Sequence, residues 1–103
     1  MDLEALKSAL ESTGIPIAYW SFPDGEAPPL PYLCYFTTGS NPLFADATVY
    51  FLSDSVRVEL YTDTKDLTVE HLVEAALACF HPKKDQEYLD TEQCWMTTYN
   101  IEV

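Results

Sequence analysis

The chain is poor in glycine, which limits the ligand-binding loops that it can form. Its three glycines, Gly14, Gly25 and Gly39, are far apart, and each stands where a turn or a helix end is expected. Loops that bind phosphate need closely spaced glycines, because the backbone must approach the ligand. No Gly-x-Ser-x-Gly motif surrounds a serine either. The sequence therefore carries no signature of nucleotide binding or of a serine hydrolase.

Basic residues are also scarce, and this argues against nucleic acid as a partner. The 103 residues include five lysines and arginines against 17 acidic residues, which gives a formal net charge of −12. Five bases spread along the chain cannot form a surface that neutralises phosphates. Aromatic residues make up 14% of the chain, and aromatics without nearby cations favour protein contacts over base stacking. We therefore expect no specific nucleic acid binding.

The three cysteines are odd in number and form no Cys-x-x-Cys pair. This usage is typical of a reducing compartment, in which each thiol behaves as a small buried apolar group. The best set for a metal site is Cys34, Cys79, His81 and Cys94, of which only Cys79 and His81 are closely spaced. Zinc ligands usually come in close pairs, so we expect no metal site, and a buried thiol at Cys79.

Long apolar runs are missing as well. No run approaches the ~20 residues that a membrane-spanning helix needs. The first residues, Met1-Asp2-Leu3-Glu4, lack the basic start of a signal peptide. We expect no contact with a membrane, and synthesis in the cytosol.

Apolar residues are plentiful, at 48% of the chain, so a folded core is expected. Residues 1–103 suit a single domain that buries about 65% of its unfolded surface. Asp2 is a suitable N-cap for a first helix with an apolar stripe at Leu3, Leu6 and Leu10. A second helix carries its apolar residues at helical spacing and stops before a proline; these residues are Val69, Leu72, Val73, Ala76, Leu77 and Phe80.

Alternation of side chains predicts the strands. The clearest case places Val56, Val58 and Leu60 on one face, with Arg57, Glu59 and Tyr61 on the other. The predicted helices cover residues 2–13 and 68–80, and the predicted strands cover residues 15–20, 32–38, 49–62, 86–90 and 94–103. The order is α-β-β-β-α-β-β. We predict an α+β fold with both helices packed on a sheet of four or five strands, mainly antiparallel or mixed.

Two long connections with unusual composition complete the pattern. The first, residues 20–31, contains four of the seven prolines, and the second, residues 39–48, contains Gly39 and Pro42 as strong breakers. Both carry apolar residues where a solvated loop would be polar. Such residues either pack back onto the sheet or contact neighbouring subunits. The candidate subunit or partner interface is Phe22, Pro28, Pro29, Leu30, Leu43, Phe44 and Tyr50.

Carboxylate chemistry on the second helix is the remaining candidate for catalysis. Glu70 and Glu74 are one helical turn apart, with His71 nearby. A metal-dependent enzyme could use His71, Glu74 and His81. The more ordinary interpretation is a solvated acidic face of the helix, with His71 at the surface. We therefore predict no catalytic residues and no cofactor.

The order of several segments resembles that of tail-completion (tail-terminator) proteins of siphophages and prophages of Gram-positive bacteria. The resemblance covers nearly the whole chain. It lies in the Pro-rich loop and in the segments Thr13-Gly14-Ile15-Pro16-Ile17, Tyr32-Leu33-Cys34-Tyr35, Ala45-Asp46-Ala47-Thr48-Val49-Tyr50, Val56-Arg57-Val58-Glu59-Leu60-Tyr61-Thr62 and Tyr99-Asn100-Ile101-Glu102-Val103.

This resemblance implies a structural protein without catalytic activity. Such proteins assemble as a ring, typically a hexamer, which caps the tail tube at the end that meets the head, and they can stay monomeric until then. The implied partners are further copies of the chain, the tail tube protein and the head connector proteins. The implied location is the host cytoplasm during assembly and the head–tail junction of the virion.

Two other functions stay open at this point. The charge of −12 on a small fold also suits an acidic DNA mimic or an immunity-type inhibitor. Head completion in place of tail completion is a neighbouring role that the sequence does not separate from the first. The subunit number also stays open.

Overall fold

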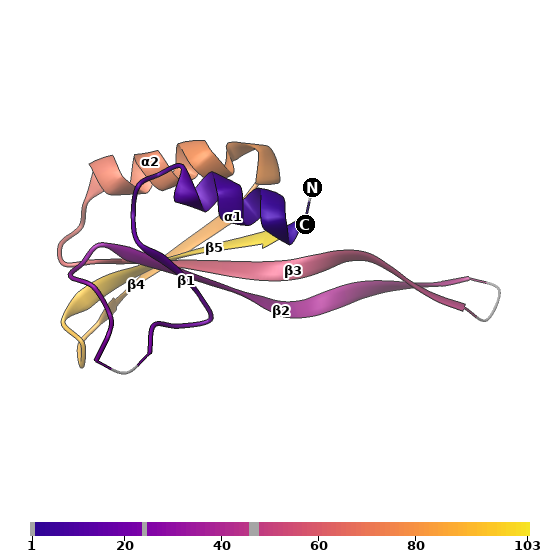
Figure 1. Ribbon diagram of the computed structural model, residues 1–103, viewed down its shortest axis with the longest axis horizontal. Coiled ribbons are helices and arrows are strands. Elements are labelled where there is room, and N and C mark those ends of the chain that lie inside the picture. The colour runs from indigo at the N-terminus through magenta and orange to yellow at the C-terminus, as the bar shows by residue number, and fades with distance from the viewer. Residues whose placement is uncertain (1, 24, 46–47) are drawn as a thin grey trace.

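The computed structural model describes residues 2–23, 25–45 and 48–103, of which residues 41–45 and 48–53 are described by their backbone alone. Figure 1 shows a two-layer arrangement with an extended hairpin. The elements are α1 (Leu3–Glu11), β1 (Ile17–Tyr19), β2 (Tyr32–Ala45), β3 (Thr48–Thr62), α2 (Leu67–Leu77), the short 3₁₀ helix η1 (Ala78–Phe80), β4 (Lys83–Leu89) and β5 (Cys94–Glu102). The predicted α+β class and element order are confirmed.

The five strands form one mixed sheet in the order β1-β2-β3-β5-β4. β1 runs parallel to β2, and the other neighbours are antiparallel. Both helices lie on the same side of this sheet (Figure 1). The sheet therefore has a helix-covered face and an opposite face, which we call the open face.

Capping residues position both helices. The Asp2 carboxylate accepts a hydrogen bond from the backbone N–H of Ala5 at 2.8 Å, as the sequence predicts. Asp66 does the same for the N–H of Val69 at 3.2 Å. Each cap satisfies a backbone donor that the first turn leaves without a partner. Neither helix in the described part of the chain is long and apolar enough to cross a membrane.

The hydrophobic core lies between the helices and the sheet. Leu6 and Leu10 of α1 and Val73 and Leu77 of α2 are completely buried against it. Cross-strand neighbours complete the core: Leu33 beside Leu60, Val58 between Tyr35 and Tyr99, and Val56 beside Ile101. Each fully buried side chain of this size contributes about 1.5–3 kcal/mol. The predicted alternation in β3 is confirmed, because Val56, Val58 and Leu60 are buried while the residues between them are only half-buried.

Two predictions about α2 and its end are wrong. Leu72 belongs to the predicted apolar stripe but is exposed, because the apolar contact of α2 with the core runs through Val73, Leu77 and the following Phe80. The stripe is therefore wider than the face that packs. Cys79 is exposed and not buried, because the chain has left the α-helix and continues as η1, which turns Phe80 inward instead.

The prediction of a long connection over residues 39–48 is also wrong. β2 continues to Ala45 and β3 begins at Thr48, so most of that segment is strand. Pro42 is tolerated because β1 pairs with β2 only as far as Tyr35, which leaves Pro42 in a strand with one open edge. Gly39 and Pro42 each stand directly after a shift in the pairing register. The breakers therefore mark bulges and not a loop.

Candidate functional site: the arm and the open face

The outer part of the β2–β3 hairpin extends beyond the rest of the sheet (Figure 1). We call residues 39–45 and 48–53 the arm. β5 pairs with β3 only up to Ser55, and a pair of backbone hydrogen bonds between Asp54 and Val103 closes that ladder. The arm gives the molecule its length, with principal extents of 51 × 28 × 22 Å. Beyond Asp54, its two described strands pair only with each other.

Two single-residue bulges interrupt the pairing in the arm region. The register skips Thr38 on β2, between the pairs Thr37–Val56 and Gly39–Ser55. It then skips one residue on β3, between the pairs Asn41–Ser53 and Pro42–Phe51. Between the bulges, the Ser40 hydroxyl donates a hydrogen bond to the Asp54 carboxylate at 2.6 Å. Bulges increase the local twist of a hairpin, so the arm turns relative to the body.

The predicted interface residues fall into two separate groups. Leu43, Phe44 and Tyr50 belong to the strands of the arm by their backbone, and their side chains lie outside the described part of the structure. The Pro-rich loop, which carries the other four, lies below the body and away from the arm's end in Figure 1. The structure therefore does not bring the two loops together into one surface, and the role of these residues stays a prediction.

The Pro-rich loop packs against the open face. Phe22 is half-buried, and its ring meets Tyr32 edge-on with the centroids 5.2 Å apart. Tyr32 in turn lies 5.1 Å from the ring of Tyr61. Pro28 and Leu30 are half-buried and Pro29 is exposed. Phe22 thus anchors the loop on the sheet, which agrees with the interpretation that apolar residues of this loop pack back onto it.

The loop also shields Cys34. This thiol is only 5% exposed, although it faces away from the helices. Burial, followed by the nearby Glu59 carboxylate, raises the pKa of the Cys34 thiol. Cys34 therefore stays protonated and unreactive near neutral pH.

Trp20, at the start of this loop, combines exposure with an unusual backbone. It has φ +74° and is 64% exposed. The N–H of Ser21 donates to the carbonyl of Tyr19 at 3.0 Å, which makes a three-residue turn with Trp20 at its centre. The indole ring rests on Phe36, with the centroids 5.0 Å apart. A bulky residue at positive φ is strained, so the packing on Phe36 helps to hold this turn.

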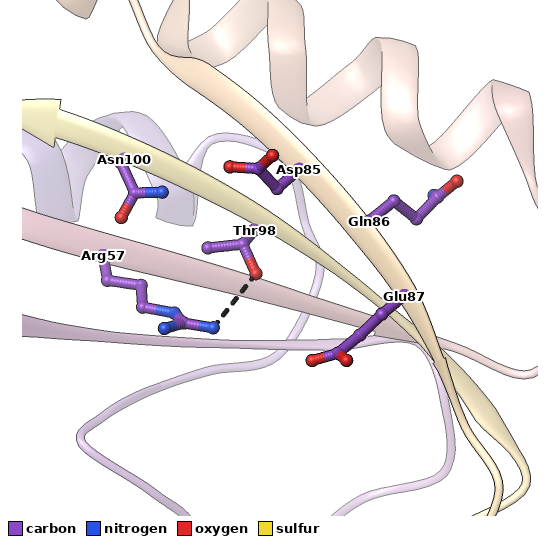
Figure 2. Close-up of a pocket in the computed structure, with 6 residues that line it drawn as sticks. All are labelled: Arg57, Asp85, Gln86, Glu87, Thr98 and Asn100. Atoms are coloured by element: carbon purple, nitrogen blue, oxygen red, sulfur yellow. Dashed lines mark hydrogen bonds between the residues drawn. The ribbon is translucent and has the colours of Figure 1, made fainter.

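The half of the open face that the loop leaves uncovered contains a shallow pocket of about 280 Å³ (Figure 2). Arg57 is one of the residues that line it, with Nε 3.1 Å from Oε2 of Glu59. That N–H is not aligned for a hydrogen bond, so the contact is an ion pair only. A guanidinium nitrogen also donates weakly to the Thr98 hydroxyl at 3.4 Å. The pocket is completed by Asp85, Gln86, Glu87 and Asn100.

Negative charge dominates this pocket. Glu59 offsets the charge of Arg57 and also accepts a hydrogen bond from the Tyr61 hydroxyl at 2.8 Å. Burial, with this hydrogen bond, raises the pKa of Tyr61. Asp85 and Glu87 are exposed and have no ion pair within the described residues. The surplus negative charge suits a basic group on a partner protein better than an anionic substrate.

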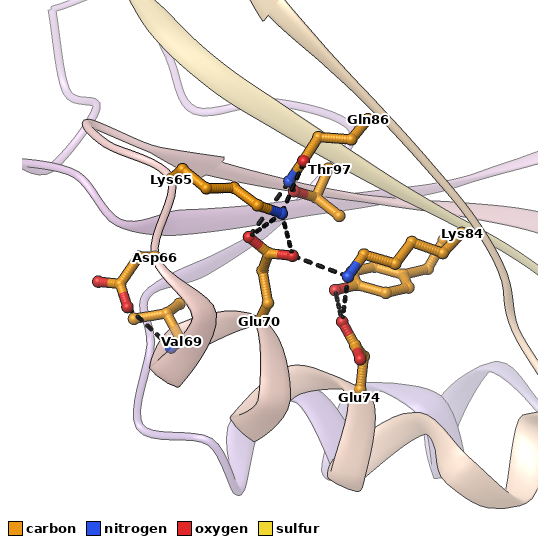
Figure 3. Close-up of polar contacts among 9 residues, drawn as sticks. Lys65, Asp66, Val69, Glu70, Glu74, Lys84, Gln86 and Thr97 are labelled. Atoms are coloured by element: carbon orange, nitrogen blue, oxygen red, sulfur yellow. Dashed lines mark hydrogen bonds and ion pairs between the residues drawn. The ribbon is translucent and has the colours of Figure 1, made fainter.

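The helix-covered face contains a buried polar cluster under α2 (Figure 3). Glu70 is 1% exposed, and its carboxylate lies 2.9 Å from Nζ of Lys65 and 2.7 Å from Nζ of Lys84. The Gln86 amide donates to Glu70 at 3.2 Å and to the Thr97 hydroxyl at 2.7 Å. These contacts join α2 to β4 and β5. Every oxygen of the buried carboxylate therefore has a partner.

Glu74 extends this cluster by one helical turn. Its Oε2 accepts hydrogen bonds from Lys84 and from the Tyr99 hydroxyl, both at 2.8 Å. Burial alone raises the pKa of both carboxyls, but the hydrogen bonds from Lys84, and from Lys65 at Glu70, outweigh it and hold both pKa values below the ordinary range. The same carboxylates raise the pKa of Lys84. The cluster is a neutral set of two lysines and two glutamates.

The prediction of a solvated acidic helix face is therefore wrong for Glu70. Helical spacing alone places Glu70 on the polar side, but β4 lies beneath it and brings Lys84 from 14 residues later in the chain. Only the polar residues on β4 at alternate positions, Lys84 and Gln86, hinted that this edge of the core is polar. His71 is exposed, as predicted.

A metal centre finds no support in this geometry. Among the described residues, no three of His, Cys, Asp or Glu lie close enough to hold a metal ion. Glu74 is engaged by Lys84 and Tyr99, while His71 is exposed on the outer side of α2. Of the proposed thiol set, Cys34 and Cys94 are buried and Cys79 is exposed.

Comparison with known proteins adds no assignment. A scan against protein-family models matches none, and a search of the curated proteins finds no relative. Function is therefore inferred from the residues and their geometry.

Proposed function

We propose that this chain is a non-enzymatic virion assembly protein that completes the tail of a long-tailed phage or prophage and joins it to the head. It acts as one subunit of a ring around the DNA passage. Its partners are further copies of the chain, the tail tube protein and the head connector proteins. It is made in the host cytoplasm and ends at the head–tail junction.

The observation that carries this proposal is the arm. An isolated two-stranded hairpin is marginally stable in water, so an arm that extends from the body favours a protein that meets another chain there. A ring subunit needs two different contact surfaces, because each copy touches its neighbours with unlike faces. The arm at one end and the body with its open face at the other provide two such surfaces.

The charge of the chain supports the same role. A ring through which DNA passes must not bind phosphates tightly. With a net charge of −12, the subunit repels the duplex over about a Debye length, ~8–10 Å, and the DNA can slide. No catalytic step is needed for this function.

Genetic deletion tests the proposal. Removing the gene from its phage or prophage should give complete heads and separate tails that fail to join, with tails of uncontrolled length. Unjoined tails of normal length would assign the protein to head completion instead. Normal infectious particles would refute an assembly role altogether.

An acidic inhibitor is the second candidate, favoured by Asp85 and Glu87 on the open face, which form no ion pair with any residue that the structure describes. Such a protein imitates the charge of DNA and binds a basic partner. It should capture a nuclease or another DNA-binding protein in a pull-down at low salt and release it at high salt. Joined, infectious particles formed without the gene, together with such a partner, would favour this function over the first.

A further inference from the structure

The β3 side of the arm is an open strand edge that lacks the usual protection. Proteins protect sheet edges with prolines, charged residues or very short strands. β4, the edge strand at one side of the sheet, carries Lys83, Lys84, Asp85 and Glu87, and β1, at the other side, has three residues. In the arm, β2 contains Pro42. Residues 48–53 of β3 have neither a charge nor a proline.

The composition of this segment makes the open edge a pairing site. Residues 48–53 read Thr-Val-Tyr-Phe-Leu-Ser, which are mainly β-branched and aromatic, with no glycine. A run of about six residues with high β-propensity and no charge is the pattern that pairs with other strands when exposed. Since β5 ends its pairing at Ser55, the outer edge of this run has no described neighbour.

Charge indicates which partner fits this edge. The chain has 22 charged residues, but residues 39–53 include only one, Asp46. Two copies with a net charge of −12 each repel one another at most surfaces. At the arm they can approach without placing like charges side by side. The arm is therefore the surface at which a second copy meets least repulsion.

We infer that the β3 edge of the arm pairs, in antiparallel orientation, with an arm strand of a second copy of this chain. Backbone hydrogen bonds supply the affinity, as in other cases of strand addition. Each added arm covers an exposed edge and stabilises a hairpin that is marginal alone. This inference rests on the proposed function for its ring geometry but not for the pairing itself.

Sedimentation velocity of the purified chain over a concentration series tests the pairing. We expect association that increases with concentration, and at least a tenfold weaker association for Phe51→Lys, because lysine on an edge strand disfavours pairing. Val49→Lys should have the same effect. Thr91→Lys, which makes the same change in charge at an exposed turn outside the arm, should associate like the parent chain.

Hydrogen exchange locates the contact. In an antiparallel strand, alternate N–H groups point to opposite edges, so the outward amides of residues 48–53 should exchange slowly only at concentrations where the chain associates. Uniformly fast exchange, with a monomer at every concentration, would overturn the inference. Thermal unfolding of each variant checks that its body is folded.

The number of copies in the largest stable assembly distinguishes this inference from the proposed function. A closed ring larger than a dimer supports both. A dimer that does not grow supports the pairing of arms but speaks against a ring. A monomer refutes the inference, and the deletion experiment then decides the assembly role by itself.

Discussion

At the scale of single residues, Glu70 is the side chain that joins the second helix to the sheet. Its carboxylate receives Lys65, Lys84 and Gln86 in a position that is closed to water. The two lysines keep part of their side chains exposed, 43% and 38% respectively. In burial, the cluster is therefore intermediate between a surface ion pair and a fully buried one.

Replacing the carboxylate should destabilise the fold. We expect Glu70→Gln to lower the free energy of unfolding by about 2 kcal/mol, more than the ~0.5 kcal/mol of an exposed pair and less than the ~3–5 kcal/mol lost when a fully buried pair is broken. Urea denaturation measures this change. Glu87→Gln, at an exposed position with no ion pair to a described residue, should change the free energy by less than about 0.5 kcal/mol. Equal effects of the two substitutions would contradict the role assigned to Glu70.

Acid should weaken the same cluster. The pKa values of Glu70 and Glu74 are lowered from the ordinary 4.5, so the folded state favours the ionised carboxylates. Their contribution is complete above pH 4.5 and is lost as the pH falls through the lowered values. The raised pKa of Lys84 acts at the other end, with stability lost as the pH rises above 10.5.

The free energy of unfolding as a function of pH checks this expectation. Below pH 4.5, the parent chain should lose stability more steeply than a Glu70→Gln, Glu74→Gln double variant. Identical slopes for the two proteins would show that other carboxylates cause the acid sensitivity.

The three thiols should differ in reactivity. Cys79 is exposed, whereas Cys34 and Cys94 are buried and have pKa values raised mainly by that burial. We expect one thiol to react quickly with a maleimide in the native protein at neutral pH, and all three to react in denaturant. Cys79→Ser should abolish the fast reaction. Fast labelling that survives this substitution would contradict the burial of the other two thiols.

At the scale of secondary-structure elements, the arm should be separable from the body. Its backbone lies beyond the point where β5 stops pairing with β3, and the core described for the body is formed by other residues. Replacing residues 41–53 by Asn-Gly, a pair suited to a two-residue hairpin turn, should leave the free energy of unfolding within about 1 kcal/mol of the parent, since loop length has a small effect on stability. The same protein should no longer associate in sedimentation experiments. A body that unfolds after this deletion would contradict the separation.

Most elements could be predicted from the sequence because their local signals agree with the packing. Asp2 caps the first helix, and the alternation around Val56 and Val58 marks the half-buried strand. The arm could not be predicted, because Gly39 and Pro42 are breakers in isolation and become compatible with a strand only where one edge is open. The burial of Glu70 could not be predicted for a similar reason, since its partner Lys84 comes from a strand that helical periodicity cannot place.

At the scale of the whole molecule, charge should control self-association. Two copies repel through net charges of −12 each, while the proposed contact through residues 48–53 is uncharged. Salt shortens the Debye length from about 10 Å at 0.1 M to about 3 Å at 1 M. Association should therefore strengthen as salt is added. Sedimentation velocity at several salt concentrations measures this, and association that weakens with salt would indicate ion pairs between copies instead.

The candidate site was only partly accessible to sequence reasoning at this scale. Composition identified an acidic protein without catalytic motifs, and apolar residues in two segments pointed to contact surfaces. Leu43, Phe44 and Tyr50 do belong to the arm, but Phe22 is engaged with Tyr32 on the sheet. Which apolar residues remain available depends on contacts between distant segments. A single sequence does not specify those contacts.

The two bulges at the base and middle of the hairpin shift the pairing register in opposite directions. The first bulge adds one unpaired residue to β2, and the second adds one unpaired residue to β3. The two shifts in register cancel, so the pairs from Pro42–Phe51 outward are those that an uninterrupted hairpin would make. The outermost stretch is thus in phase with the body although the stretch between the bulges is not. Insertions or deletions made in matched pairs would change how far the protein reaches, while every cross-strand partner in the core stays the same.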